Sequence, residues 1–129
     1  MDCAIDPAIA EGVHLFNNQK FFEAHEALET VWLSASGDDK RFLHGLIQVA
    51  AAFHHHTRQN SAGFRSLLEK GWKKLESFGD AKQGLDVAGL RKQLQPWRDW
   101  LDSVQTHRVP APPLPWIGRS SHGSTKTAT

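Results

Sequence analysis

The sequence of 129 residues contains a single cysteine, a single methionine and no tyrosine. Because one thiol cannot pair within its own chain, an intrachain disulfide is excluded, and the Cys-rich spacings of structural zinc sites are absent. An excess of charge of one sign is also lacking, since 15 Lys and Arg residues stand against 14 Asp and Glu residues for a net charge of +1. This balance argues against nucleic acid or an anionic membrane as a partner.

Long hydrophobic runs are missing as well. The longest, residues 46–53, is interrupted by Gln48 and is too short to cross a bilayer. The first twelve residues, MDCAIDPAIAEG, are acidic and lack both the basic region and the apolar core of a signal peptide. We therefore expect a soluble cytoplasmic protein, and the length favours one domain with its own hydrophobic core.

Helical periodicity dominates the sequence, and no strand pattern is present. We expect an all-α fold in which residues 1–106 form a single compact bundle of about five helices. Gly79 should stop the fourth helix, and Pro96 should kink or split the fifth. The first expected helix begins at Pro7 with Asp6 as its cap, and the second begins near Gln19. Asp38 or Asp39 is expected to cap the third helix and Ser61 the fourth, and the fifth begins near Val87.

The composition changes from residue 107 onward. The run VPAPPLPWIGRSSHGSTKTAT is rich in proline and then in serine, threonine and glycine. We expect residues 107–129 to form an extended tail that is partly disordered towards its end. Leu114, Trp116 and Ile117 are the tail residues predicted to pack on the bundle.

The stretch FFEAHEALETVWL, residues 21–33, places a histidine and a carboxylate inside an apolar helix face. His25, Glu29 and Trp32 are spaced i, i+4, i+7 and therefore share one stripe of the helix. An ionised carboxylate buried between apolar flanks is costly unless it has a partner. The pattern predicts a polar site around Glu29, with Arg41 as one candidate cation.

A second polar stripe runs along the predicted helix KRFLHGLIQVAAAFHHHTR, residues 40–58. Gln48 and His55 lie two turns apart on the face opposite the main apolar stripe. This face is either exposed to solvent or, because it carries a glycine and three alanines, buried against the helix of residues 21–33. In the second case Gln48 and His55 supply partners for His25 and Glu29.

The chain resembles the small helical bacterial and archaeal proteins grouped as domain of unknown function 309. These proteins are recognised by His, three residues, Glu, two residues, and then Trp or Tyr, here His25, Glu29 and Trp32. The block FLHGLIQVAAAFHHHTRQN also resembles the family, and the likeness covers about residues 12–78. It implies a compact all-helical fold and a metal-binding role for the motif, with no established activity.

The sequence departs from the family pattern at two positions. His44 stands where glutamine is expected, and Gln59 stands where the turn before Asn60 tends to have glycine. The second departure concerns the geometry of the turn and leaves the motif unaffected.

Two hypotheses for the site stay open. In the first, His25 and Glu29 chelate a divalent metal ion with His55 as third ligand, and zinc, iron and nickel all suit this donor set. In the second, a hydrogen-bonded His25–Glu29 pair locks two helices in an interaction module or homodimer. The surrounding pocket residues would be Gln48, Trp32, Arg41, His44 and Glu26. Neither hypothesis identifies a substrate or a reaction.

Overall fold

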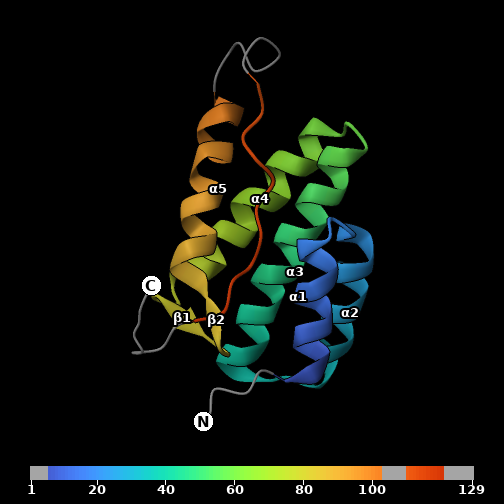
Figure 1. The fold of residues 1–129 in the computed structure, drawn as a ribbon, viewed down its shortest axis with the longest axis vertical. Helices are drawn as coiled ribbons and strands as arrows, with labels where there is room; N and C mark the ends of the chain where they lie inside the picture. Colours follow the sequence, from blue (N-terminus) through green and yellow to red (C-terminus); the bar gives the residue numbers. More distant parts are fainter. Residues whose placement is uncertain (1–5, 103–109, 121–129) are drawn as a thin grey trace.

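The computed structural model describes residues 6–102 and 110–120, which form an α-helical bundle with one short hairpin (Figure 1). The expected all-α class is confirmed. None of the helices in these described parts is long and apolar enough to span a bilayer. The elements are α1 (Pro7–Asn17), α2 (Phe21–Ser34), α3 (Gly37–Thr57), α4 (Ser61–Glu76), β1 (Ala81–Lys82), β2 (Leu85–Asp86) and α5 (Val87–Asp102).

The helix starts follow capping chemistry, with one correction. The Asp6 side chain accepts a hydrogen bond from the backbone N–H of Ala8 at 2.8 Å, as predicted for a cap ahead of a proline. The cap of α4 is Asn60 rather than Ser61, because the Asn60 side chain accepts from the N–H of Gly63 at 3.0 Å. Both asparagine and serine are favoured as helix caps, so the sequence alone does not decide which of these two neighbouring residues caps the helix.

The start of α3 and the turn that follows it also differ in detail from the expectation. Asp38 and Asp39 lie inside the first turn of α3, and the residue at the cap position is Ser36. Their negative charges interact favourably with the positive end of the helix dipole. Gln59 adopts a φ of 60° in the turn between α3 and α4. The glycine expected there would take this left-handed conformation without strain, so glutamine holds the same turn at some conformational cost.

The prediction that no strand is present is wrong in one place. Ala81–Lys82 pairs antiparallel with Leu85–Asp86, so β1 and β2 form a hairpin. The two residues between them, Gln83 and Gly84, have φ values of 55° and 76°, which is the pattern of a type I′ turn. Strands of two residues are too short to show an alternating pattern in the sequence.

The expected split of the helix at Pro96 is also wrong, because α5 continues through it, and the alternative expectation of a kink stays a prediction. Pro96 lies on the exposed side of the helix. Water can therefore hydrate the carbonyl that loses its partner when the proline N–H is missing.

The central helix is α3, which packs against both α2 and α4 (Figure 1). Its Phe53 is fully buried, and its ring lies 5.1 Å from the rings of Phe64 on α4 and Trp97 on α5 and 5.6 Å from that of Phe21 on α2. One hydrophobic core thus extends from α2 across α3 to α5.

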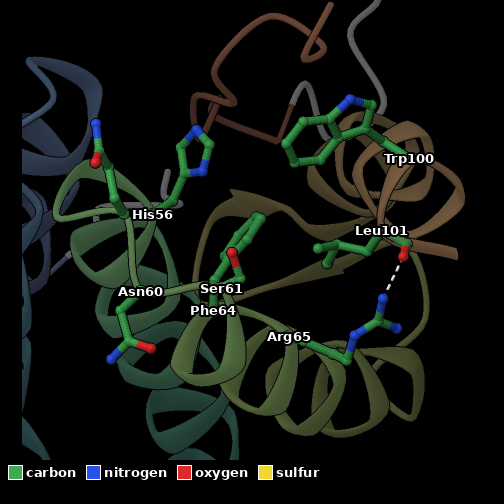
Figure 2. A pocket seen from close by; sticks show the side chains of 8 residues that line it. His56, Asn60, Ser61, Phe64, Arg65, Trp100 and Leu101 are labelled. Atoms are coloured by element: carbon green, nitrogen blue, oxygen red, sulfur yellow. Dashed lines mark hydrogen bonds between the residues drawn. The ribbon is translucent and has the colours of Figure 1, made fainter. Parts of the chain in front are cut away.

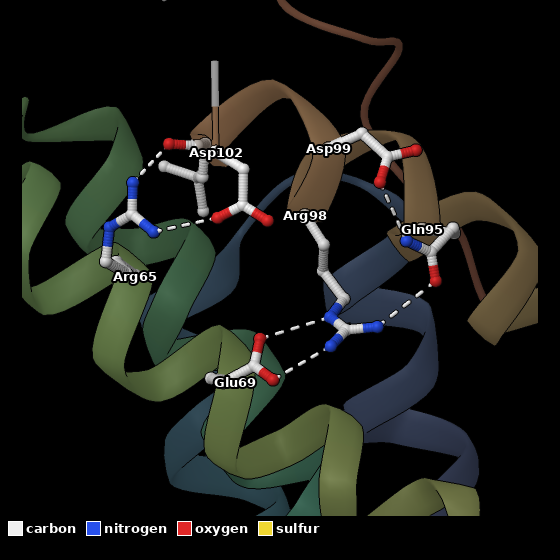
Figure 3. Close-up of polar contacts among 7 residues, drawn as sticks. Arg65, Glu69, Gln95, Arg98, Asp99 and Asp102 are labelled. Carbon is white, nitrogen blue, oxygen red and sulfur yellow. Dashed lines mark hydrogen bonds and ion pairs between the residues drawn. The ribbon is translucent and has the colours of Figure 1, made fainter. Parts of the chain in front are cut away.

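Polar contacts of two arginines, Arg98 and Arg65, join α4 to α5 (Figure 3). The Arg98 guanidinium donates to both oxygens of Glu69, at 3.1 Å and 2.9 Å, and lies 4.3 Å from the ring of Trp72. Arg65 pairs with Asp102 at 3.2 Å nearer the end of α5. The bidentate geometry makes the first pair the more directional of the two.

Residues 110–120 run back along α5 towards the hairpin (Figure 1). The backbone of Ile117 donates to and accepts from the Asn17 side chain at 2.7 Å and 2.9 Å, and the Trp97 indole donates to the carbonyl of Pro113 at 3.0 Å. Ile117 is buried and Leu114 packs on the core as predicted, whereas Trp116 is 57% exposed. The predicted boundary near residue 106 and the predicted disorder of the last residues lie outside the described residues.

Candidate functional site

A cavity of about 200 Å³ lies over α3 between α2 and α4. It brings together five of the eight residues predicted for the site. Its lining consists of His25, Glu29 and Trp32 from α2, His44, Ile47, Gln48 and Ala51 from α3, and Leu67 from α4. The i, i+4, i+7 spacing on α2 and the i, i+4 spacing of His44 and Gln48 on α3 explain why these side chains meet.

Unsatisfied polar atoms distinguish this cavity from ordinary packing. Gln48 is only 8% exposed, and its Oε1 has no hydrogen-bond partner among the described residues. The buried Nδ1 of His25 is likewise without a partner in the described part of the chain. Leaving such an atom unpaired costs about 1–3 kcal/mol, so the cavity is suited to a ligand that interacts with these two atoms.

The expectation that Glu29 is buried is wrong. Glu29 is exposed at the rim of the cavity, and no hydrogen bond to His25 and no ion pair with Arg41 is present among the residues that the structure describes. On the same side of α2, Phe22 and Leu33 are 48% and 68% exposed. The stripe therefore lies at the edge of the buried face, because the apolar flank beyond it faces solvent.

Three predicted site residues lie outside the cavity lining. The Nδ1 of His55 lies 3.1 Å from the Nδ2 of Asn60, at the other end of α3. Arg41 and Glu26 are both exposed. Within the described ranges, no three His, Cys, Asp or Glu side chains form a group that could hold a metal ion.

The imidazole of His44 is held in its neutral form at one end of the cavity. Burial lowers the pKa of His44, and the nearby charge of Lys74 lowers it further. The His44 ring centroid lies 5.8 Å from that of Trp32, whose face carries the ammonium of Lys40 at 4.3 Å. A neutral imidazole can donate one hydrogen bond and accept another.

No residue pattern indicated that α4 contributes to the site. Leu67 belongs to an apolar stripe that serves the core in general, and nothing in its pattern distinguishes a cavity wall from ordinary packing. Ile47 and Ala51 were missed for a related reason. They are apolar neighbours of Gln48, and only the separation of α2 from α4 makes them the floor of a cavity.

A family model described as "Domain of unknown function (DUF309)" matches residues 9–67. Residues 9–67 are therefore similar to this family. The matched segment reaches from α1 into α4 and contains every residue that lines the cavity. The resemblance predicted from the His25, Glu29 and Trp32 spacing is thus supported.

A curated relative is the uncharacterized protein YpuF of Bacillus subtilis (strain 168). It is 31% identical over 99 residues, which cover 74% of this chain and 57% of the Bacillus protein. The chain therefore spans a little more than half of that relative's length, and the likeness extends beyond the DUF309 segment of this chain.

We expect acid to destabilise the protein partly through His56, whose pKa is lowered by burial among aromatic rings. Because the folded state disfavours the proton, this contribution is constant above the unfolded pKa of about 6.5 and is lost as the pH falls below it. One histidine can change the free energy of unfolding by at most about 1.4 kcal/mol per pH unit.

Urea denaturation at about pH 7.5 and pH 5.5 measures this dependence. The His56→Gln variant should lose less stability between the two pH values than the wild type does. An equal loss in both proteins would contradict the assignment to His56.

Proposed function

We propose that the protein binds a divalent metal ion in the cavity between α2, α3 and α4. The observation that carries the proposal is the pair of unpartnered donor atoms, Gln48 Oε1 and His25 Nδ1, in a cavity that also contains a carboxylate. An amide oxygen, an imidazole nitrogen and a carboxylate are all ligand types that first-row divalent metals accept.

The donors fit a site that is completed by water. His25 and Glu29 are one helical turn apart on α2, a spacing at which two side chains can bind one ion. Because the described residues contain no preassembled group of three such side chains, the chain would supply these two and Gln48, and water would fill the remaining positions. The exposure of Glu29 gives an ion direct access from solvent.

The positive charge around the cavity limits the expected affinity. The charge of Lys74 contributes to the lowered pKa of His44. The pKa of Lys74 is itself lowered, mainly by burial and further by the charges of Arg41 and Lys70. This neighbourhood opposes a further cation. We therefore expect micromolar rather than nanomolar binding, with selectivity for zinc or nickel over magnesium because imidazole is the softer ligand. When bound, such an ion would act as a Lewis acid towards a molecule that enters the cavity.

Calorimetric titration of tag-free protein with Zn²⁺ and Ni²⁺ tests the proposal. The Glu29→Gln variant should bind at least about tenfold more weakly, because it loses the charged ligand. Glu26→Gln is the matched control, since it makes the same change on the same helix at an exposed position outside the cavity. Equal affinity in the wild type and Glu29→Gln would overturn the proposal.

A further control addresses the histidine run at the end of α3. His54, His55 and His56 are adjacent in the sequence and could bind nickel without any contribution from the cavity. His55→Asn should leave the affinity unchanged if the ion binds between α2, α3 and α4. Loss of binding in His55→Asn with retention in Glu29→Gln would place the ion at the histidine run instead.

A second candidate function is an interaction module formed by α2. Its support is the exposure of two large apolar side chains, Phe22 and Leu33, along one side of that helix. Light scattering of the protein as it elutes from a size-exclusion column measures its mass and so tests whether α2 mediates self-association. A dimeric mass that becomes monomeric in Leu33→Glu would favour it, and a monomeric wild type would remove self-association from consideration.

A further inference from the structure

A second cavity lies at the opposite end of α3 from His44 (Figure 2). Its volume is about 420 Å³, more than twice that of the cavity at His25 and within the range of small-molecule sites, roughly 300–1,000 Å³. It is lined by the last turn of α3, the first turns of α4 and the last turn of α5. Nothing in the motif of α2 reaches it, so it is independent of the proposed metal site.

Three aromatic rings border this cavity. The His56 ring lies 4.9 Å from that of Phe64 and 6.0 Å from that of Trp100, the latter nearly perpendicular at 89°. Phe64 belongs to the core and is 1% exposed, so this wall is rigidly supported from behind. Rings in these orientations can hold a flat ligand by stacking and edge contacts.

Among the described residues that line the cavity, Arg65 is the only one with a formally charged side chain, and it lies beside Leu101 (Figure 2). Its guanidinium donates to the Leu101 carbonyl and pairs with Asp102 at 3.2 Å. The side chains of Arg65 and Asp102 are 55% and 78% exposed. Such exposed pairs contribute little to stability, so a carboxylate from a ligand can replace Asp102 at small cost.

His56 adds no second positive charge to the cavity. Burial lowers the pKa of His56, so the imidazole is neutral at neutral pH and offers one donor and one acceptor. Ser61 adds a hydroxyl to the same lining. The cavity therefore has an aromatic wall, neutral hydrogen-bonding groups and a single guanidinium beside Leu101.

We infer that this cavity binds a small planar aromatic carboxylate, with its ring against His56 and Trp100, which Phe64 supports from behind, and its carboxylate on Arg65. A guanidinium binds a carboxylate through two parallel hydrogen bonds, which fixes the orientation of the ring relative to the wall. The volume accommodates a fused two-ring compound of the size of an indole carboxylate.

Titration of the full ¹⁵N-labelled chain with indole-3-carboxylate in metal-free buffer tests the inference by NMR. Chemical-shift changes should centre on the residues of this cavity, and the neutral probe indole-3-carboxamide should bind about tenfold more weakly. Equal binding of the two probes, shift changes centred on α2, or no change at millimolar probe would each overturn the inference.

Substitutions at two arginines complete the experiment. Arg65→Gln should weaken binding of indole-3-carboxylate about tenfold, and Arg65→Lys, which keeps the charge, should recover part of the loss. Arg58→Gln is the matched control, because Arg58 is exposed nearby and does not line the cavity. Unchanged binding in a folded Arg65→Gln, or equal weakening in Arg58→Gln, would contradict the assignment of the carboxylate to Arg65.

Discussion

Replacing Trp97 with alanine should lower the free energy of unfolding by about 3–5 kcal/mol, the range for deletion of a large buried aromatic side chain. Trp97 is 1% exposed, and its ring contacts those of Phe53 at 5.1 Å, His56 at 4.9 Å and Phe64 at 5.6 Å. Its indole N–H also donates to the carbonyl of Pro113. Chemical denaturation followed by circular dichroism measures the loss.

Trp116→Ala is the matched control for this substitution. Trp116 is 57% exposed, and the hydrogen bonds that it makes to Gln93 use its backbone rather than its indole. Its removal should change stability by no more than about 0.5 kcal/mol. A loss at Trp97 no larger than the loss at Trp116 would show that the indole does not belong to the core.

Gly71→Ala should destabilise the protein by about 1–3 kcal/mol, although alanine is the better helix former by up to about 1 kcal/mol. A Cβ on Gly71 would lie 2.9 Å from the carbonyl oxygen of Gly45 and 2.8 Å from Cγ2 of Val49. Because one of these neighbours is backbone, α3 and α4 would have to move apart along their whole contact. Thermal denaturation measures the effect.

Gly45→Ala provides the comparison for Gly71→Ala on the facing helix. A Cβ on Gly45 would meet only side-chain atoms, those of Lys74 at 3.1 Å and Leu75 at 3.3 Å. These atoms can shift by a few tenths of an ångström, so the loss should be smaller than at Gly71. A Gly71→Ala protein more stable than the wild type would mean that the two helices are not held at this separation.

The sequence predicted the helices well because each one carries its own period and its own stop signals. Asp6 with Pro7 and the left-handed Gly79 mark helix ends through local chemistry. The interpretation of α3 as a helix buried on two sides is also confirmed, since Gln48 is buried as well as the apolar residues around it.

The site was predicted only in part, because periodicity fixes angles within one helix but not where the neighbouring helix lies. His25 and Gln48 do meet in one cavity, as their stripes predicted. Glu29 shares a stripe with His25, yet it is exposed because α2 is rotated so that Leu33 on its outer flank faces solvent. Similarly, two turns along α3 carry His55 past the cavity to Asn60.

Features that rest on hydrogen bonds to the backbone rather than on residue type left no trace in the sequence. The two-residue strands of the hairpin are defined by their hydrogen bonds and not by any alternation of residue type. Predicting the two hydrogen bonds between the Asn17 side chain and the backbone of Ile117 would have required knowledge of where α1 lies relative to residues 110–120.

That same pair of hydrogen bonds has a consequence for the order in which the chain folds. Asn17 and Ile117 are separated by 100 positions, so their contact closes most of the polypeptide into one loop. The successive helix pairs α1–α2, α2–α3 and α3–α4 are joined by short turns and can form before that loop closes. We therefore expect residues 110–120 to dock late during folding and to separate early when the protein opens, which would free the Trp97 indole N–H from the Pro113 carbonyl before the helical bundle itself is lost.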